Sequence, residues 1–257
     1  MHAGRPLAEP VEVTYLYDGS LAGFYCCVHA SVYSREVPMA IYPHEKAQPT
    51  LFREVSIATD YEKAARVRNS VTEKISLRAR DLIETVFLSC LTHKELHMLR
   101  FLLFAYRAGE KAPLMLGHPL VDVLIKAEKH LGGEVHLLLG FVRFSDYDGT
   151  LLATITPKNF VLPFMRRHFE LRFPNENFMI YDKTHQAALM HENRRSRIVP
   201  LLEAEFALPG AEEEAYRALW KRFYDTIAIE ARYNPKCRMT HMPKRYWENM
   251  IEMQGEA

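Results

Sequence analysis

Residues 136–156 read HLLLGFVRFSDYDGTLLATIT, and the character of the sequence changes within this stretch. Its first part, residues 136–144, is rich in residues that favour β-strands. Asp148-Gly149 is a strong hairpin signal, and residues 151–156 read as the returning strand. Helical patterns dominate before this stretch, and short strand-like runs dominate after it. The sequence therefore predicts an α+β fold, with a helical N-terminal half packed with an antiparallel β-meander in the C-terminal half.

The segments on either side of this stretch follow from their apolar spacing and their breakers. Before it, we expect a strand over residues 11–16, a helix that Ser20 caps and that runs to about residue 33, helices over residues 60–107 and a helix that follows His118-Pro119 and breaks at Gly132-Gly133. After it, we expect a helix over residues 161–173, three short strands over residues 178–181, 187–190 and 198–201, and a last helix over residues 212–232. No clean linker divides the chain. We therefore predict one domain over residues 1–257, helix-rich in residues 1–132 and sheet-rich in residues 133–257.

Composition excludes several classes of protein. Lys and Arg number 33 against 32 Asp and Glu, so the net charge is +1 and any contact with nucleic acid must depend on a local patch. The longest apolar runs are far shorter than the ~20 residues that a membrane-spanning helix needs, so we predict no membrane contact. The N-terminal residues lack a signal-peptide core. The cysteines, which have no C-x-x-C spacing, are Cys26, Cys27, Cys90 and Cys237. Reduced thiols in a cytoplasmic protein fit this pattern best.

Short catalytic motifs are missing from the sequence. It contains no G-x-G-x-x-G, no G-x-x-x-x-G-K-[ST] and no G-x-S-x-G. His93 and His97 are four residues apart, but Lys94 occupies the position where the metalloprotease motif has its glutamate. A solvated helix start explains these histidines, and turn chemistry explains Asp146 and Asp148. We therefore predict no metal and no cofactor.

Basic residues gather in two places. Residues 61–80 hold six basic side chains against two acidic ones, for which a solvated helix face is the favoured interpretation. Residues 231–247 hold five cations and no acid, and they also contain Tyr233, Tyr246 and Trp247. Cations attract phosphates, while aromatic rings either stack on bases or pack the chain end against the core. For Trp247, packing against the core is the better interpretation.

Several segments carry a family resemblance. In chain order they are Tyr17-Asp18-Gly19-Ser20, Gly140-Phe141-Val142-Arg143-Phe144, Val161-Leu162-Pro163, His168-Phe169, Arg172-Phe173-Pro174 and Met242-Pro243-Lys244-Arg245-Tyr246-Trp247. Together they resemble a family of bacterial proteins labelled probable DNA-metabolism proteins, a domain of unknown function. The resemblance covers nearly the whole chain, and its last segment is the most specific. The hairpin departs from the family pattern, in which a longer acidic turn is common.

The resemblance implies a biological setting. Members of this family are typically encoded beside a putative DNA-repair radical-SAM protein, and some are fused to a uracil-DNA-glycosylase-like domain. A role in DNA repair or modification beside those partners is therefore implied. The chain lacks the cysteine spacing of an iron–sulfur cluster, so it is not itself the radical-SAM enzyme. The family supplies no established reaction and no catalytic residue.

Three functions remain open at this stage. The first is a nucleic-acid-associated protein of DNA repair or modification that acts with a radical-SAM partner and contacts DNA through Arg143, Arg166, Arg167, Lys236, Arg238, Lys244, Arg245 and Trp247. The second is an adaptor that docks on the radical-SAM protein without touching nucleic acid. The third is an enzyme acting on a modified base, with His168 or His241 as the acid–base group.

Overall fold

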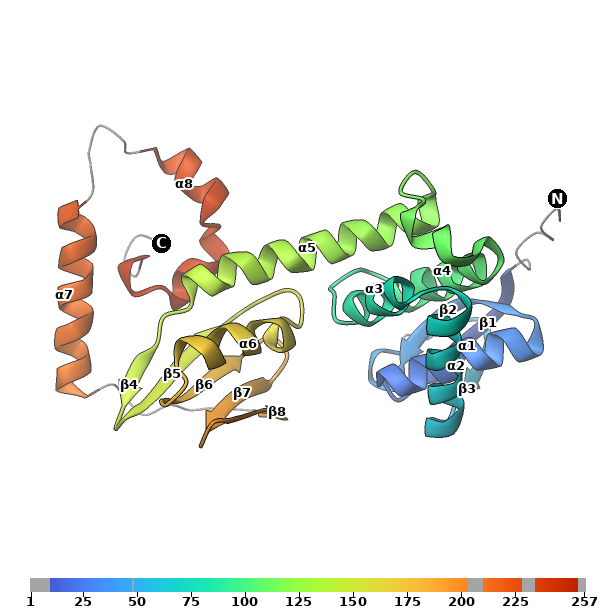
Figure 1. Cartoon of the computed structure of the whole chain (residues 1–257), viewed down its shortest axis with the longest axis horizontal. Coiled ribbons are helices and arrows are strands. Elements are labelled where there is room, and N and C mark those ends of the chain that lie inside the picture. Colours follow the sequence, from blue (N-terminus) through green and yellow to red (C-terminus); the bar gives the residue numbers. More distant parts are fainter. Residues whose placement is uncertain (1–9, 48, 203–209, 228–233, 254–257) are drawn as a thin grey trace. The chain divides into compact units, whose positions relative to one another are not determined.

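The computed structural model describes residues 10–47, 49–202, 210–227 and 234–253 (Figure 1). The chain divides into two compact units, Met1–His130 and Leu131–Ala257, and the boundary lies within helix α5 (Pro119–Phe141). Each unit has its own hydrophobic core. The prediction of a single domain concerns how the two units associate, and it stays a prediction.

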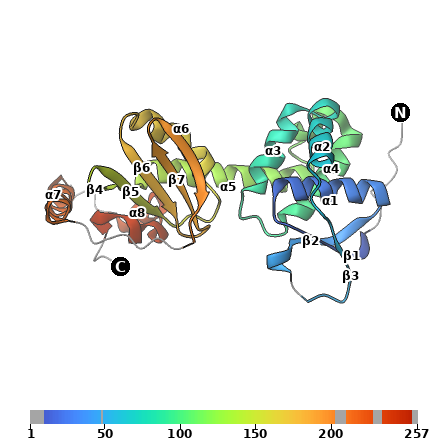
Figure 2. The same cartoon turned by 90° about the horizontal axis from the view of Figure 1, so that it is seen from below.

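The N-terminal unit is a layer of helices on a small parallel sheet. Its strands are β1 (Pro10–Tyr17), β2 (Val37–Pro43) and β3 (Arg53–Ser56), and both β2 and β3 pair with the central β1 in parallel. Its helices are α1 (Leu21–Ser34), α2 (Tyr61–Lys74), α3 (Leu77–Phe87) and α4 (Lys94–Ala108), and α5 begins in this unit. Short 3₁₀ helices span His44–Lys46 and Gly109–Leu114. Figure 2 shows the helices on one side of the sheet.

Capping side chains explain where these helices begin. The Ser20 hydroxyl accepts a hydrogen bond from the Gly23 amide at 2.9 Å, as its position in the sequence predicted. Asp60 caps α2 and Ser76 caps α3 in the same way. Each cap satisfies an amide that has no partner within its own helix, and it contributes about 1 kcal/mol to helix stability.

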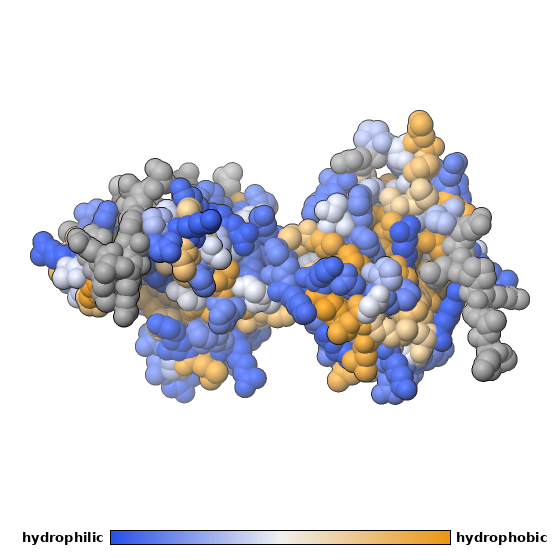
Figure 3. Space-filling view, turned by 90° about the horizontal axis from the view of Figure 1, so that it is seen from above, coloured by the Kyte–Doolittle hydropathy of each residue, from blue (hydrophilic) through white to orange (hydrophobic). Residues whose placement is uncertain are grey.

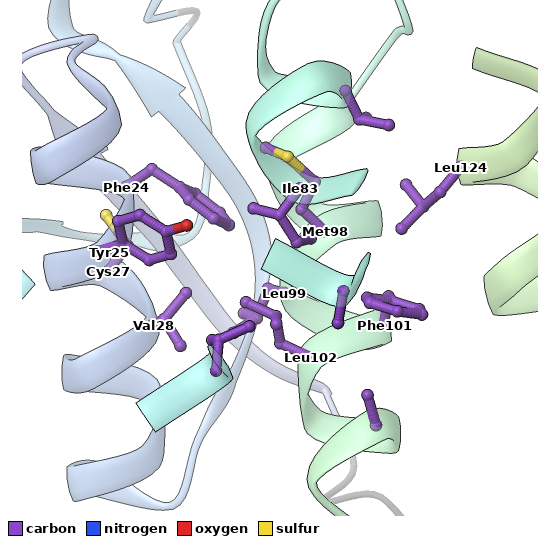
Figure 4. Close-up of a cluster of buried hydrophobic side chains, with 14 of the residues drawn as sticks. Phe24, Tyr25, Cys27, Val28, Ile83, Met98, Leu99, Phe101, Leu102 and Leu124 are labelled. Atoms are coloured by element: carbon purple, nitrogen blue, oxygen red, sulfur yellow. The ribbon is translucent and has the colours of Figure 1, made fainter. Parts of the chain in front are cut away.

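The core of the N-terminal unit lies between α1, α3 and α4 (Figure 4). Phe24 and Ile83 point toward one another there, and Met98 and Leu99 from α4 complete the contact (Figure 4). All four side chains are fully buried. Burying a side chain of this size stabilises the fold by about 1.5–3 kcal/mol, so this cluster holds the helices at fixed positions.

The C-terminal unit contains a five-stranded sheet with the order β4-β5-β6-β7-β8. Its strands are β4 (Ser145–Tyr147), β5 (Thr150–Ile155), β6 (Asn177–Asp182), β7 (Ala187–Glu192) and β8 (Arg195–Pro200). Its helices are α6 (Leu162–Arg172), α7 (Ala211–Ile227) and α8 (Pro235–His241), followed by the 3₁₀ helices η4 (Lys244–Asn249) and η5 (Ile251–Met253). Helix α6 packs against β7 and β8, and η4 packs against β5. The predicted α+β class is confirmed, while residues 228–233 at the end of the predicted last helix lie outside the described residues.

The sheet corrects one detail of the prediction, because it is mixed rather than a fully antiparallel meander. Strands β5 and β6 pair in parallel, whereas the other three pairings are antiparallel. A parallel pair requires a crossover connection, and α6 supplies it. The predicted hairpin is confirmed: Asp148 and Gly149 have φ values of 50° and 82°, the left-handed conformations of a type I′ turn. The Asp146 carboxylate accepts a hydrogen bond from the Gly149 amide at 2.8 Å, so this acid stabilises the turn.

Helix α5 corrects a second prediction, since it does not break at Gly132-Gly133 but continues to Phe141 (Figure 1). Residues 136–141, which were expected to begin a strand, are therefore helical. Leu131 and Leu138 are buried one helical repeat of seven apart, and both glycines fall on the exposed face between them. The buried face outweighs the ~1 kcal/mol that each glycine costs in a helix. No helix in the described ranges is long and apolar enough to cross a membrane.

Candidate functional site

Arg143 follows α5, and its guanidinium is held by the buried carboxylate of Glu252. The Arg143 Nε atom lies 3.1 and 3.2 Å from the two carboxylate oxygens, and the Glu252 side chain is 1% exposed. The same guanidinium donates to the Gly140 carbonyl and lies over the Trp220 ring, 5.7 Å from its centre. Burial by itself would raise the pKa of Glu252, but its hydrogen bonds, chiefly from Arg143, lower it. Arg143 therefore neutralises a buried acid.

Arg245 has a similar role beside Glu134, whose side chain is also 1% exposed. The Arg245 guanidinium lies 3.1 Å from the Glu134 carboxylate, and the Tyr246 hydroxyl donates to the same oxygen at 2.9 Å. The backbone amides of Lys158 and Asn159 and the side-chain amide of Asn159 also donate to this carboxylate. Burial would raise the pKa of Glu134, but these hydrogen bonds outweigh burial and lower it. Arg245, which the sequence predicted to contact phosphate, thus forms an ion pair with a buried acid.

Helix α6 carries three of the predicted residues. Arg166 pairs with Glu170 one turn later, at 2.8 Å. Arg167 is exposed and has no carboxylate within ion-pair distance in the described part of the chain. His168 is partly buried, and its Nε2 atom has no hydrogen-bond partner among the residues that the structure describes. Of these three, Arg167 is the side chain best placed to meet a phosphate.

Trp247 organises the basic segment near the C-terminus. Its ring is 5% exposed, and its Nε1 atom donates to the Met242 carbonyl at 2.9 Å, so the packing interpretation is confirmed. The Arg238 guanidinium and the Lys244 ammonium lie 5.0 and 5.4 Å from the centre of the ring. The structure therefore brings Arg238, Lys244 and Trp247 together in one basic cluster.

Two further predicted residues lie on the surface of α8. Lys236 is exposed near the start of the helix, and His241 is exposed at its end. The His241 Nδ1 atom lies 3.0 Å from the Cys237 carbonyl oxygen. Arg232 and Tyr233, from the same basic segment, lie outside the described residues.

The described residues of the C-terminal unit form a cavity with a volume of about 840 Å³. Residues from the end of α5, from α6, from α7 and from η5 surround it. We name it the aromatic cavity, and it is lined by Leu139, Gly140, Val142, Arg143, Phe144, Phe169, Arg172, Phe173, Glu213, Tyr216, Arg217, Leu219, Trp220, Phe223 and Ile251. Its volume lies within the ~300–1,000 Å³ typical of small-molecule and cofactor sites.

Aromatic rings form two walls of this cavity. Phe144 contacts Phe169 and Phe173 edge-on, with ring centres 5.4 and 5.2 Å apart. On α7, Trp220 and Phe223 remain 40% and 52% exposed. Rings in edge-to-face contact hold one another in place and keep other faces open to a ligand.

Three arginines line the cavity, and they differ in their partners. Arg143 pairs with Glu252, and Arg217 pairs with Glu213 at 2.8 Å. Arg172 lies over the Phe173 ring, 5.6 Å from its centre, and no carboxylate is within ion-pair distance of it in the described ranges. Arg172 is therefore the guanidinium of the cavity best able to meet an incoming anion.

The structure scatters the predicted contacts rather than gathering them in one cleft. Of the predicted residues, Arg143 lines the aromatic cavity, whereas the others lie on α6, α8 or η4, and neither His168 nor His241 lines it. Sequence reasoning missed Arg172 and Trp220 as cavity residues. The available signal was the helical spacing of the large apolar side chains in residues 216–227. This spacing predicts an apolar face on a helix, but it does not show which residues pack against that face. Within the described ranges, no cluster of His, Cys, Asp or Glu is suited to a metal ion.

Comparison with known families gives one match. A family model described as a domain of unknown function, DUF4130, matches residues 92–252, well over half of the chain. The chain belongs to the DUF4130 family. No curated protein matches the chain.

The DUF4130 match confirms the expected domain of unknown function, while the DNA-metabolism setting and the radical-SAM partner stay predictions. The match spans α4, α5 and the described elements of the C-terminal unit up to residue 252. It therefore includes the aromatic cavity, the basic cluster around Trp247 and both buried ion pairs. The sheet and first three helices of the N-terminal unit lie outside it.

Proposed function

We propose that this protein associates with nucleic acid in DNA repair or modification, and that it binds an unpaired base in the aromatic cavity of its C-terminal unit. The observation that carries the proposal is the combination of exposed rings with one available guanidinium, namely Trp220 and Phe223 together with Arg172. Base–aromatic stacking contributes about 1–3 kcal/mol per base and tolerates any base. An arginine without an acidic partner can grip a phosphate with two parallel hydrogen bonds.

The ion pairs of the cavity arginines support this proposal indirectly. Arg143 and Arg217 are already neutralised, so they hold the walls of the cavity in position. Phosphate contact then depends on cations without acidic partners. In this proposal these are Arg172 at the cavity and the surface cations Arg167, Lys236 and Lys244.

A fluorescence titration tests the proposal directly. The chain contains two tryptophans: Trp220 lines the cavity and Trp247 is buried outside it. In a Trp247→Phe variant, the remaining emission reports the cavity alone. We expect a single-stranded oligonucleotide to quench this emission more strongly than a duplex, because only unpaired bases can stack on the ring.

A salt series identifies the phosphate contact. Arg172→Ala should lower the slope of log affinity against log salt by about 0.7, the value of one contact to a single strand. Arg195→Ala is the matched control, because Arg195 is an exposed arginine on β8 outside the cavity. Unchanged slopes in both variants, or no quenching at low salt, would reject the cavity as the binding site.

A second candidate function is an adaptor for the radical-SAM protein that the family resemblance implies. Helix α7 favours it, since Tyr216, Leu219, Phe223 and Ile227 are 52–66% exposed and recur at helical spacing. Ile227 does not line the aromatic cavity, so Ile227→Glu separates the two functions. Loss of co-purification with the partner protein, with oligonucleotide binding retained, would favour the adaptor.

A further inference from the structure

The N-terminal unit holds a second cavity, an open groove between α1, α2 and α4 with a volume of about 520 Å³. Its floor includes Val28, which is 1% exposed. Val67 and Leu103 line it as well, and both pack against the core. Figure 3 shows hydrophobic residues on the surface of this unit, among hydrophilic ones. The groove therefore offers an apolar surface that is large enough to bind a small molecule.

One wall of the groove is aromatic. The rings of His29 and Tyr33, one turn apart on α1, stack with an angle of 9° between their planes and centres 6.1 Å apart. Tyr33 is 85% exposed, so its ring is free of core packing. On α4, the Tyr106 hydroxyl donates to the Ser70 hydroxyl at 3.2 Å, which places a polar pair beside the apolar floor. A planar ring entering the groove would therefore meet flat aromatic surface.

The charges of α2 are divided between the groove and the rest of the helix. Lys63 pairs with Asp60 and Arg68 pairs with Glu84. The other two cations of α2, Arg66 and Lys74, line the groove, and no carboxylate lies within ion-pair distance of either in the described residues. The basic side chains of α2, which the sequence predicted to form one solvated face, thus divide into two sets: one set pairs with acids, and the other set lines the groove.

The geometry of Arg66 and Lys74 suits anionic groups. Arg66 lies four residues before Ser70 and Lys74 lies four residues after it, so all three residues share one face of α2. Successive residues of this set are about 6 Å apart along the helix axis. Arg107 adds a third cation from α4, and no Asp or Glu lines the groove. Because Arg66 and Lys74 have no carboxylate within ion-pair distance among the described residues, the groove has an electrostatic preference for an anion.

We propose that this groove is a binding site for a small planar aromatic anion, whose ring lies on the apolar and aromatic surface and whose phosphate or carboxylate meets Arg66 and Lys74. The site lies within the N-terminal unit, and α1 and α2 are outside the matched family region. It is therefore independent of the base-binding function proposed for the C-terminal unit.

The test uses the full chain and the fluorescent dye 8-anilinonaphthalene-1-sulfonate, an aromatic anion that contains a planar naphthalene ring. We expect the dye to bind wild-type protein, and Arg66→Ala with Lys74→Ala to weaken binding at least about tenfold, as expected for the loss of charge-assisted hydrogen bonds. The control is Lys111→Ala with Lys129→Ala, which removes the same charge from exposed lysines outside the groove. Ser70→Trp, which places a large side chain in the groove while keeping the cations, should abolish binding there.

Displacement by a matched pair of compounds defines the ligand class. 1-Naphthyl phosphate should displace the dye at least about tenfold better than uncharged 1-naphthol, because only the phosphate can pair with the cations. Equal displacement by the two, or equal dye affinity in the wild type and the Arg66–Lys74 double variant, overturns the proposal. Oligonucleotide binding should be unchanged in that variant, and its loss would instead make the groove part of a nucleic-acid surface. Since the double variant alters only exposed side chains, its result stands even if Ser70→Trp fails to fold.

Discussion

The guanidinium of Arg245 lies 3.1 Å from the buried carboxylate of Glu134, although 111 residues separate them in the sequence. The Tyr246 hydroxyl donates to the same carboxylate, so the segment around η4 is fastened to the second half of α5 by a shared acid. A buried carboxylate needs such donors, because leaving a charge unpaired in the interior is costly. Cations that pair with a buried carboxylate, as Arg245 does, stabilise the fold, whereas cations without such a partner remain available for binding.

Arg245→Ala should lower the free energy of unfolding by about 1.5–3 kcal/mol, the range for a hydrogen bond to a charged group, because Glu134 keeps its other donors. Lys244→Ala, at the neighbouring residue, should cost less than about 1 kcal/mol, since it removes a cation–π contact at the surface. Urea denaturation of both variants measures the difference. Equal midpoints would show that Arg245 does not stabilise Glu134.

Acid should destabilise the protein through Glu134 and Glu252. Their pKa values in the folded state are held below the ordinary glutamate value of 4.5, so they stabilise the fold above that pH, and the contribution is lost as the pH falls through the lowered values. Melting temperatures measured from pH 7 down to pH 3 should therefore fall below about pH 4.5. In Glu134→Gln the decline should be shallower, and parallel curves for variant and wild type would contradict this assignment.

Replacing the glycines inside α5 should stabilise the protein. A Cβ atom at Gly132 or Gly133 meets nothing within 4 Å, and both positions are helical. Gly132→Ala and Gly133→Ala should each add about 0.4–1 kcal/mol, chiefly by restricting the unfolded chain. Gly149→Ala is the contrasting variant, because Gly149 has φ of 82° in the hairpin turn and alanine is strained there. Calorimetric melting temperatures should move in opposite directions.

Truncation of the two tryptophans should affect different properties of the protein. Trp247 is 5% exposed, so Trp247→Ala should cost about 3–5 kcal/mol of stability. Trp220 is 40% exposed, so Trp220→Ala should cost less but should weaken oligonucleotide binding, because the stacking surface is lost. Chemical denaturation and binding titrations on the same preparations separate the effects. A Trp220→Ala variant that binds as tightly as the wild type would exclude stacking on this ring.

Thiol reactivity should divide the four cysteines into two pairs. Cys90 and Cys237 are exposed, whereas Cys26 and Cys27 are buried, and burial raises the pKa of the Cys27 thiol. A thiol reagent such as Ellman's should modify two cysteines in the native protein and all four in denaturant. Rapid modification of a third cysteine under native conditions would indicate that α1 opens readily.

Local features of the chain could be predicted from the sequence because neighbouring residues cause them. Ser20 begins a helix through a hydrogen bond three residues away, and Asp148-Gly149 forms its turn through left-handed backbone conformations that these residues adopt readily. The repeated apolar spacing of residues 60–107 likewise predicted helices, and the structure has α2, α3 and α4 in that range. In each case the interaction that decides the structure lies within one or two turns of the chain.

Other features were decided only by tertiary structure. The sequence by itself determined the α+β class, the hairpin, the ends of several helices and the basic character of residues 234–247. Tertiary contacts decided that α5 continues through Gly132-Gly133, because a buried face offsets the local cost of glycine. They also decided which arginines are available for binding: Arg143 and Arg245 look like free cations in the sequence, but Glu252 and Glu134, each more than 100 residues away, neutralise them. A charge pattern along the chain shows where cations are, whereas only the fold brings each of them to an acid or leaves it open to a ligand.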